Sequence, residues 1–153
     1  MFTKPSLEFC LTCFEKMYRY IWQLKGEAVT EEKIEHVREY VTQVWLGETT
    51  GYDIVGNKKG VMLYGWEDSF RVLYISDIWI EPAYRRKGIA TALLRYAIQK
   101  QREIDNKALT ILYVLDNNLP AIQLYNKLGF KKRQFRDDDF GGEMFYPRDK
   151  ELF

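Results

Sequence analysis

The sequence predicts a single mixed α/β domain, in which one central β-sheet of six to seven strands is flanked by about four helices. Three observations predict this class. Residues 72–80 read as an alternating strand, and a basic turn that contains glycine leads from them into an amphipathic helix. Residues 108–115 form a continuous β-prone run, which is typical of a strand buried on both faces. Together they predict a strand–helix–strand unit in the middle of the sheet.

The composition fits one globular domain. Of the 153 residues, 46% are hydrophobic and 16% aromatic, which is enough to build a core. Lys and Arg total 23 against 22 for Asp and Glu, so the formal net charge is +1, which argues against a dedicated nucleic-acid binder. No apolar run is long enough to span a bilayer, and the first residues lack a signal-peptide pattern. We therefore expect a cytoplasmic protein that binds neither nucleic acid nor membrane.

Two amphipathic helices are expected within the first 45 residues. Ser6 can cap the first helix, which runs to about Leu24 and is followed by Gly26. Thr30 precedes the second helix, which has two glutamates in its first turn. The predicted buried stripe of that helix is Ile34, Val37, Val41, Val44 and Trp45. His36 lies beside this stripe, either facing solvent or contacting a substrate.

Cys10 and Cys13 form a Cys-x-x-Cys pair in the first helix. Such a pair can be redox-active or can supply half of a zinc site. The chain has no other cysteine and one histidine, so a zinc site would need a carboxylate ligand. Cys10 also falls on the apolar stripe of the helix, so a buried thiol is the simpler interpretation, and we expect no metal.

Two hairpins and two further helices complete the fold. Residues 52–55 and 61–66 are predicted to pair around a five-residue loop, and residues 130–136 and 140–146 are predicted to form the final hairpin. The helix after the basic turn continues to about Glu103. Another helix follows the central strand, with a proline in its first turn and a glycine at its end.

The basic turn carries three consecutive cations and a glycine followed by small residues. The first N–H groups of a helix have no partner inside the helix and lie at the positive end of its dipole, so they can bind an anion. Gly88 and Ala90 keep side chains out of the way, while Arg85, Arg86 and Lys87 add charge. This pattern predicts a pyrophosphate site, but a solvated basic helix start would look the same.

Two motifs resemble those of the GNAT superfamily of acetyl-coenzyme A-dependent N-acetyltransferases. Arg85-Arg86-Lys87-Gly88-Ile89-Ala90 is similar to the Gln/Arg-x-x-Gly-x-Gly/Ala signature, which binds the pyrophosphate of the coenzyme in that family. Further on, Asn118-Leu-Pro-Ala-Ile-Gln-Leu-Tyr-Asn-Lys-Leu-Gly-Phe130 resembles the second motif, Asn-x-x-Ala-x-x-Leu-Tyr-x-x-x-Gly-Phe. The resemblance covers roughly residues 52–146. Before that, only the two-helix arrangement fits.

The resemblance implies roles for single residues. It implies that acetyl-CoA is the cosubstrate, that backbone groups near Ile78 and Ile80 bond its pantetheine arm, and that Asn118 contacts the coenzyme. The residues implied to hold the pyrophosphate are Arg85, Arg86, Lys87, Gly88, Ile89, Ala90 and Thr91. Tyr125 matches the tyrosine that is proposed in the family to protonate the leaving thiolate.

An acetyl thioester is already activated, so such an enzyme has to position an amine, take its proton and return a proton to the thiolate. Tyr125 can perform the last step, or it can be a core tyrosine on a helical stripe. Asp77, just before the coenzyme-binding end of its strand, is the candidate base, although it can also be structural. Glu81 is a weaker candidate. Some relatives carry a glutamate five residues before the motif asparagine, where this chain has Tyr113.

The acceptor is expected to be a primary amine that attacks directly in a ternary complex, either a small cationic amine or a lysine or N-terminal amine. The second helix is rich in glutamate and the last loop carries Asp137–Asp139, so an acidic rim can steer a cation, or these faces are simply solvated. Two other classes stay open: a non-catalytic acyl-CoA-binding regulatory module, and a protein-interaction module on the same fold. Homodimers are common in the family.

Overall fold

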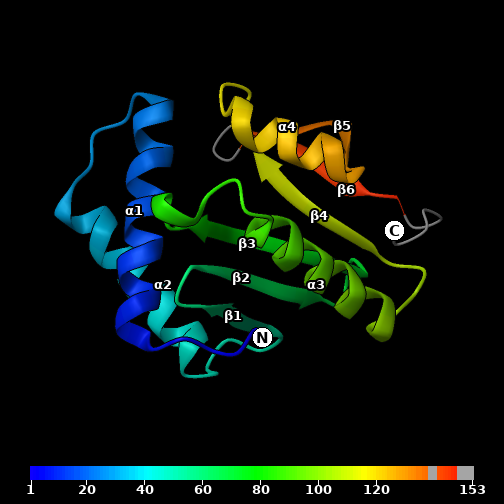
Figure 1. Ribbon diagram of the computed structural model, residues 1–153, viewed down its shortest axis with the longest axis horizontal. Coiled ribbons are helices and arrows are strands. Elements are labelled where there is room, and N and C mark those ends of the chain that lie inside the picture. The colour runs from blue at the N-terminus through cyan, green and yellow to red at the C-terminus, as the bar shows by residue number, and fades with distance from the viewer. Residues whose placement is uncertain (138–140, 148–153) are drawn as a thin grey trace.

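The computed structural model describes residues 1–137 and 141–147, and it describes the side chains of all of these except 134–137. The helices are α1 (Leu7–Lys25), α2 (Glu31–Trp45), α3 (Ile89–Ile104) and α4 (Leu119–Leu128), with a short 3-10 turn, η1 (Pro82–Tyr84). The strands are β1 (Tyr52–Asn57), β2 (Gly60–Glu67), β3 (Val72–Ile80), β4 (Leu109–Val114), β5 (Lys131–Asp137) and β6 (Gly141–Tyr146). The strands form one sheet in the order β1-β2-β3-β4-β6-β5 (Figure 1), which confirms the predicted mixed α/β class.

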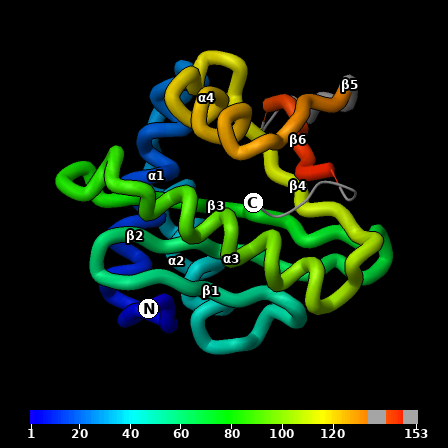
Figure 2. Tube along the Cα trace, turned by 45° about the vertical axis from the view of Figure 1, so that its right-hand side comes forward, coloured from blue at the N-terminus to red at the C-terminus, as the bar shows by residue number. Residues whose placement is uncertain are grey.

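Helices cover both faces of the sheet. The core on one face joins α1 and α2 to β1 and β2, and the core on the other face joins α3 and α4 to β2, β3, β4 and β6. Figure 2 shows α3 running across the sheet on the face away from α1 and α2. β3, α3 and β4 form the predicted strand–helix–strand unit, and its two strands are parallel. In the described ranges, no helix is long and apolar enough to cross a membrane.

The first two helices begin where their capping residues predict. Ser6 Oγ accepts a hydrogen bond from the Phe9 N–H, and Thr30 Oγ1 accepts one from the Lys33 N–H, each at 3.2 Å. Gly26 ends α1 in the left-handed conformation, with φ 72°. The buried side chains of α2 are Ile34, Val37, Val41 and Val44, as predicted, and Trp45 is half-buried. His36 is exposed, which agrees with its solvent-facing interpretation.

The prediction of a five-residue loop between β1 and β2 is wrong. The strands continue through Asn57 and resume at Gly60, so only Lys58 and Lys59 form the turn. Asn57 Oδ1 accepts a hydrogen bond from the Lys59 N–H at 2.8 Å, which closes this short turn. Gly56 lies within the paired strand, where a Cβ would stand 2.2 Å from the Gly60 carbonyl oxygen. The glycines that suggested a loop therefore permit close strand contact instead.

β3 and β4 pair over only three positions and then separate. The last pair is Tyr74 with Ile111, yet β3 continues to Ile80 and β4 to Val114. Figure 1 shows the two strands diverging toward their carboxyl ends, below α4. On their other sides β3 pairs with β2 and β4 pairs with β6. The backbone N–H and C=O groups that face the gap are therefore not used in the strand pairing of the described residues. The candidate site residues described below lie around this gap.

Candidate active site

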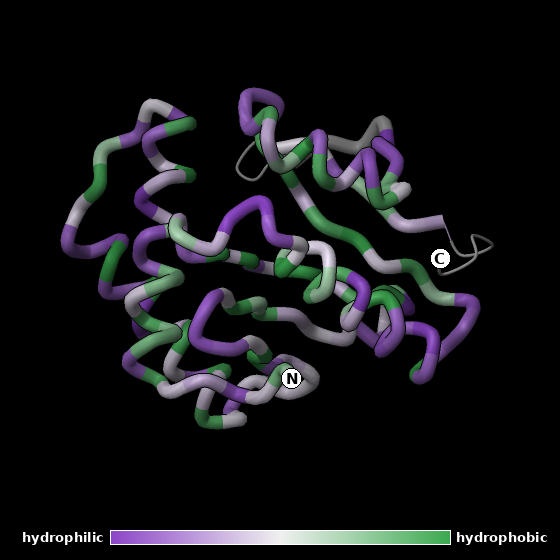
Figure 3. Tube along the Cα trace, in the orientation of Figure 1, coloured by the Kyte–Doolittle hydropathy of each residue, from purple (hydrophilic) through white to green (hydrophobic). Residues whose placement is uncertain are grey.

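The amino end of α3 lies at the carboxyl end of β3, beside the gap. Gly88 is the N-cap of α3, with φ 82°, and no side chain caps this end. The first hydrogen bond within the helix joins the Ala92 N–H to the Gly88 carbonyl at 3.0 Å, so the N–H groups of residues 89–91 precede it. Figure 3 shows the turn that leads into this helix as strongly hydrophilic. The geometry is that of an anion-binding helix start.

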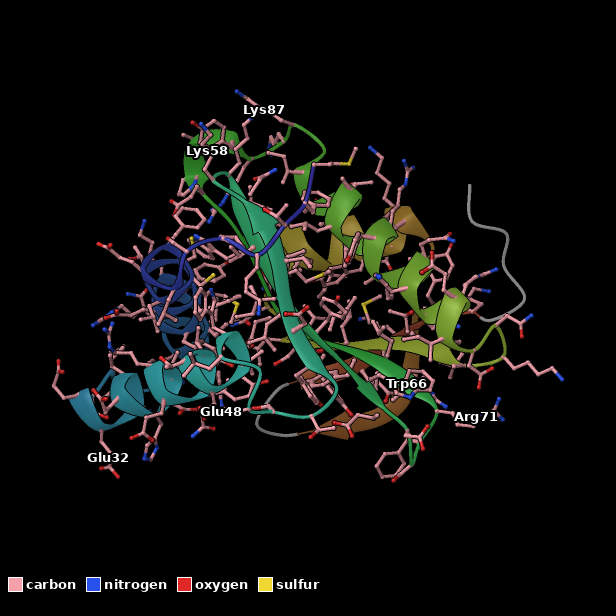
Figure 4. The ribbon with its side chains drawn as sticks, turned by 90° about the horizontal axis from the view of Figure 1, so that it is seen from below. Glu32, Glu48, Lys58, Trp66, Arg71 and Lys87 are labelled. Carbon is pink, nitrogen blue, oxygen red and sulfur yellow. The ribbon has the colours of Figure 1, made fainter. Side chains whose placement is uncertain are left out.

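The cations of this turn do not all point the same way. Arg85 Nε donates a hydrogen bond to the Ile80 carbonyl oxygen at 2.9 Å, and its guanidinium lies 4.5 Å from the centre of the Trp79 ring. Arg86 is exposed and holds a left-handed backbone conformation, with φ 62°. Lys87 lies over the Tyr84 ring, and Figure 4 shows it at the same end of the molecule as Lys58. The structure thus pairs Arg85 with Ile80, a carbonyl that the sequence resemblance assigns to pantetheine.

A β-bulge interrupts β3 where it borders the gap. Leu63 of β2 pairs with Asp77 and the next residue, Tyr64, pairs with Ile75, so Ser76 is the extra residue. A bulge turns the following side chains to the opposite faces of the sheet. Bulges are common next to active sites for this reason.

The bulge decides where Asp77 points. Before it, Ile75 packs in the core on the α3 face, and after it Ile78 and Ile80 pack against that same core. Trp79 packs in the core beneath α1 and α2. With unbroken alternation Asp77 would face α3, but the extra residue turns it toward α1 and α2. The alternating strand predicted over residues 72–80 is therefore correct in extent and wrong in its strict alternation.

Asp77 is a buried carboxylate surrounded by hydroxyl groups. Its side chain is 4% exposed, and within the described residues it has no cationic partner. Ser76 Oγ donates to Asp77 Oδ2 at 2.8 Å, and the Tyr40 hydroxyl lies 3.2 Å from Ser76 Oγ. Burial raises the pKa of Asp77 to about 6, while hydrogen bonds from Tyr18 and Ser76 act in the opposite direction. A carboxyl group with this pKa can exchange protons near neutral pH.

Tyr125 lies on the opposite face of the sheet. Its side chain is 7% exposed and belongs to the core formed with β4 and β6, where its ring lies 5.9 Å from that of Phe130. Burial raises the pKa of Tyr125 to about 12, so the hydroxyl carries its proton at neutral pH. This is the protonation state that a proton donor needs.

α1 contacts the turn that leads into α4. Tyr20 of α1 donates to the Asn118 Oδ1 at 3.4 Å, and Asn117 Nδ2 donates to the Leu24 carbonyl at 2.9 Å. Asn118 is also the N-cap of α4, without a capping bond from its side chain. The structure therefore places Asn118 beside the gap and in contact with α1.

Glu81, the weaker candidate base, is engaged elsewhere. Its carboxylate accepts a hydrogen bond from the Cys13 thiol at 3.2 Å and forms an ion pair with Lys16. Cys10 and Cys13 are both free and fully buried, which agrees with the buried-thiol interpretation. Among the described residues, no three His, Cys, Asp or Glu side chains gather as they would around a metal ion.

Several neighbours of the gap escaped the sequence-based reasoning. Tyr18 and Tyr40 lie at helical spacing on apolar stripes, a pattern that predicts core packing. It does not predict that Tyr18 contacts Asp77 or that Tyr40 contacts Ser76. Tyr113 lies opposite Glu143 of β6, a buried carboxylate 3.1 Å from the Arg133 guanidinium. A carboxylate thus does stand beside Tyr113, contributed by the neighbouring strand and paired with a cation. Only the fold could reveal these contacts.

The predicted acidic rim is only partly described. Asp137–Asp139 lie outside the residues whose side chains the structure describes. On α2, the acidic residues are exposed, and Figure 4 shows Glu32 pointing away from the sheet.

Comparison with known proteins agrees with this geometry. A sequence model of the Acetyltransferase (GNAT) family matches residues 8–130. An N-alpha-acetyltransferase of Sulfurisphaera tokodaii is 32% identical over 105 residues, covering 65% of this chain and 62% of that protein. One from Saccharolobus solfataricus is 42% identical over 59 residues, covering 39% of this chain and 35% of that protein. The matched region thus spans less than two thirds of either relative.

A solved structure extends the likeness to nearly the whole fold. The PaiA N-acetyltransferase of Thermoplasma acidophilum, solved in complex with coenzyme A, superposes with a TM-score of 0.72 at 19% identity, covering 95% of this chain and 97% of that one. At an identity this low, the match shows a similar fold and no more. The family match covers most of the chain and includes both sequence motifs, so this protein belongs to the GNAT family of acetyltransferases.

Proposed function

We propose that this protein is an N-acetyltransferase, which transfers the acetyl group of acetyl-CoA to a primary amine by direct attack in a ternary complex. The observation that carries the proposal is the arrangement around one gap in the sheet. Asp77 lies on β3, beyond the point where this strand separates from β4, on the face covered by α1 and α2, and Tyr125 of α4 lies on the opposite face. One buried group can accept a proton and the other can donate one, as amine acetylation requires.

The groups that would bind the coenzyme lie along the gap and at the start of α3. Backbone groups along residues 75–80 of β3 can bond the pantetheine arm, as they would bond another strand. The N–H groups at the start of α3, with Arg86 and Lys87, can hold the pyrophosphate. A Cβ at Gly88 would meet no atom within 4 Å, so the backbone there is open to a ligand. Arg85 would have to leave the Ile80 carbonyl for the pantetheine arm to use that oxygen.

The chemical step then needs three proton transfers. Asp77 takes a proton from the acceptor ammonium, directly or through water, and the free amine attacks the thioester carbonyl. The C–N bond forms, the C–S bond breaks, and Tyr125 gives its proton to the leaving thiolate. The nitrogen, positively charged after the attack, loses its second proton as the amide forms, and this proton, carried by water, restores the Tyr125 hydroxyl. Neither residue needs a metal ion for these steps.

The acceptor is best sought among amines of polypeptides. The archaeal relatives are named N-alpha-acetyltransferases, so an N-terminal amine is the first acceptor to test. A lysine side chain and a small cationic amine are the next ones.

Calorimetric titration with acetyl-CoA tests the coenzyme site. We expect the natural protein to bind and the double variant Arg86→Ala/Gly88→Trp to lose binding. Lys100→Ala, a charge removal elsewhere on α3, is the matched control and should bind normally. Equal binding by the double variant would place the coenzyme elsewhere.

Mass spectrometry tests the reaction. Protein and acetyl-CoA are incubated with a peptide that has a free N-terminus and no lysine, with an N-terminally blocked peptide that contains lysine, and with spermidine. A gain of one acetyl group identifies the acceptor class. Tight coenzyme binding without acetylation of any amine would instead favour the non-catalytic module.

A further inference from the structure

A chain of hydroxyl groups leads away from the buried Asp77 carboxylate. Ser76 Oγ lies 2.8 Å from Asp77 Oδ2, and the Tyr40 hydroxyl lies 3.2 Å from Ser76 Oγ. Both distances are within hydrogen-bonding range. The chain begins at a carboxylate that is 4% exposed and ends at a half-buried tyrosine on α2, a helix whose outer face is in solvent.

The β-bulge creates this chain. In an unbroken strand, adjacent side chains point to opposite faces, so Ser76 and Asp77 could not share a hydrogen bond. Because Ser76 is the extra residue, its hydroxyl reaches the carboxylate of its neighbour and also the helix above.

We propose that Ser76 and Tyr40 form a proton relay, which returns Asp77 to its charged form by passing the proton taken from the acceptor amine to solvent. This inference rests on the proposed function, in which Asp77 is the base. Ser76 and Tyr40 act through Asp77, so they are positioning residues and do not touch the substrate.

The proton balance is simple. Before reaction, Tyr40 donates to Ser76 and Ser76 donates to the charged Asp77. After Asp77 has taken a proton from the amine, that proton passes to Ser76 Oγ as the Ser76 proton passes to Tyr40 and the Tyr40 proton to water. Each hydroxyl ends with one proton and Asp77 ends as a carboxylate, so no charged hydroxyl persists.

Two other tyrosines, Tyr18 and Tyr74, lie near Asp77. Tyr18 of α1 hydrogen-bonds the carboxylate, but its ring packs on Trp22 at 5.7 Å, and no hydrogen bond in the described part of the chain leads onward from it. Tyr74 of β3 lies near the Asp77 carboxylate, whose charge raises the pKa of Tyr74; Tyr74 also hydrogen-bonds Ser76, and its ring packs against that of Tyr113. Burial raises the pKa of Tyr18, Tyr40 and Tyr74, so all three are neutral hydroxyls at pH 7. Ser76 is therefore the link from Asp77 to further hydroxyl groups, and of its two tyrosine partners Tyr40 is the one that lies on a helix with its outer face in solvent.

A carboxyl-carbon NMR titration of the unliganded protein tests the first link. In the natural protein we expect Asp77 to titrate near pH 6. Ser76→Ala removes a donor to the charged form, so the pKa of Asp77 should rise, and Ser76→Thr should restore it. Tyr40→Phe leaves the Ser76 donor in place and should change the pKa of Asp77 little.

The second test is the pH dependence of kcat and KM. Ser76→Ala and Tyr40→Phe should each lower kcat about tenfold, a part of the roughly 100- to 10,000-fold that a positioned proton-transfer group contributes. KM for the acceptor should stay near its natural value, because neither residue touches it. Ser76→Thr should recover kcat. The matched control is Tyr52→Phe, which removes a half-buried hydroxyl bonded to Glu67 rather than to Ser76, and should keep full activity.

The variants separate failure of the relay from failure of the function. If Asp77→Asn abolishes acetylation while Ser76→Ala and Tyr40→Phe keep the natural kcat at every pH, the relay is wrong and the base assignment stands. If Asp77→Asn is fully active, both are wrong. A loss of kcat in Tyr40→Phe, with the pKa of Asp77 unchanged, is the result that a merely structural tyrosine would not give.

Discussion

The Cys13 thiol donates a hydrogen bond to the Glu81 carboxylate, with Sγ 3.2 Å from Oε1. Lys16, in the next turn of α1, lies 3.2 Å from the other carboxylate oxygen. The backbone N–H of Glu81 in turn donates to the Lys59 carbonyl at 2.9 Å. One residue thus holds α1, the β1–β2 turn and the end of β3 together, immediately before the turn that leads to α3. Glu81 therefore fixes the backbone next to the start of α3, where the coenzyme is proposed to bind.

Both cysteines should be unreactive in the folded protein. Burial raises the pKa of Cys10 to about 11, and burial together with the Glu81 hydrogen bond raises the pKa of Cys13 further. Thiolate is the reactive form, so a chromogenic disulfide reagent at pH 8 should release almost no thiol product until denaturant is added. Rapid labelling of the native protein would show that this helix is not packed as described.

Asp77→Asn should stabilise the fold at neutral pH while abolishing activity. Burial raises the pKa of Asp77 from 3.8 to about 6, so between these values the folded state binds more protons than the unfolded chain. The free energy of unfolding therefore falls as pH rises through this window, by roughly 3 kcal/mol in total. Asparagine carries no charge and avoids this loss.

Urea unfolding at pH 4, 5, 6 and 7.5 measures the effect. The stability advantage of Asp77→Asn should be smallest at pH 4 and largest above pH 6. An advantage that does not change with pH would mean that the Asp77 carboxylate is not desolvated. A buried Asp77 carboxylate that destabilises the fold when charged indicates that this residue serves function rather than stability.

Much of this fold follows from local signals, but the site does not. Ser6, Thr30 and Gly26 mark helix ends through hydrogen bonds and dihedral angles that involve only their neighbours in sequence, so those boundaries are predictable. The bulge at Ser76 depends on pairing with β2, and no property of residues 72–80 alone reveals it. The direction of Asp77, and hence its contact with Ser76 and the two helices, could not be inferred without it.

Tyr125→Phe should lower kcat about 100-fold, at the lower end of the range for a proton donor, and leave acetyl-CoA affinity unchanged. The change removes one oxygen from a ring that otherwise keeps its contact with Phe130. Steady-state kinetics and calorimetry measure the two effects. Tyr96→Phe, on α3 against the same core, is the control and should keep its activity. If Tyr125→Phe lost stability and kept its kcat, Tyr125 would be a core residue only.

Thr110→Val should stabilise the protein by about 1 kcal/mol, because an unpaired buried hydroxyl costs that much or more. Thr110 is fully buried in β4, and its Oγ1 has no hydrogen-bond partner among the described residues. Valine has nearly the same shape and suits a strand. Thermal or urea unfolding measures the difference, and Thr110→Ser, which keeps the hydroxyl and loses a methyl group, should be less stable than the natural protein.

Gly88→Ala tests two roles of Gly88 separately: its backbone conformation at the start of α3 and its proposed contact with the coenzyme. The φ of Gly88 is 82°, and a Cβ there would touch no atom within 4 Å, so the cost of alanine is conformational, about 1 kcal/mol. Gly26, with φ 72° and equally open surroundings, ends α1 and offers a matched site. Gly26→Ala and Gly88→Ala should lose similar stability in urea. Only Gly88→Ala should also weaken acetyl-CoA binding in calorimetry, because the pyrophosphate is proposed to lie against this backbone. Equal acetyl-CoA affinities in the two variants would contradict the proposal that the coenzyme binds at the start of α3.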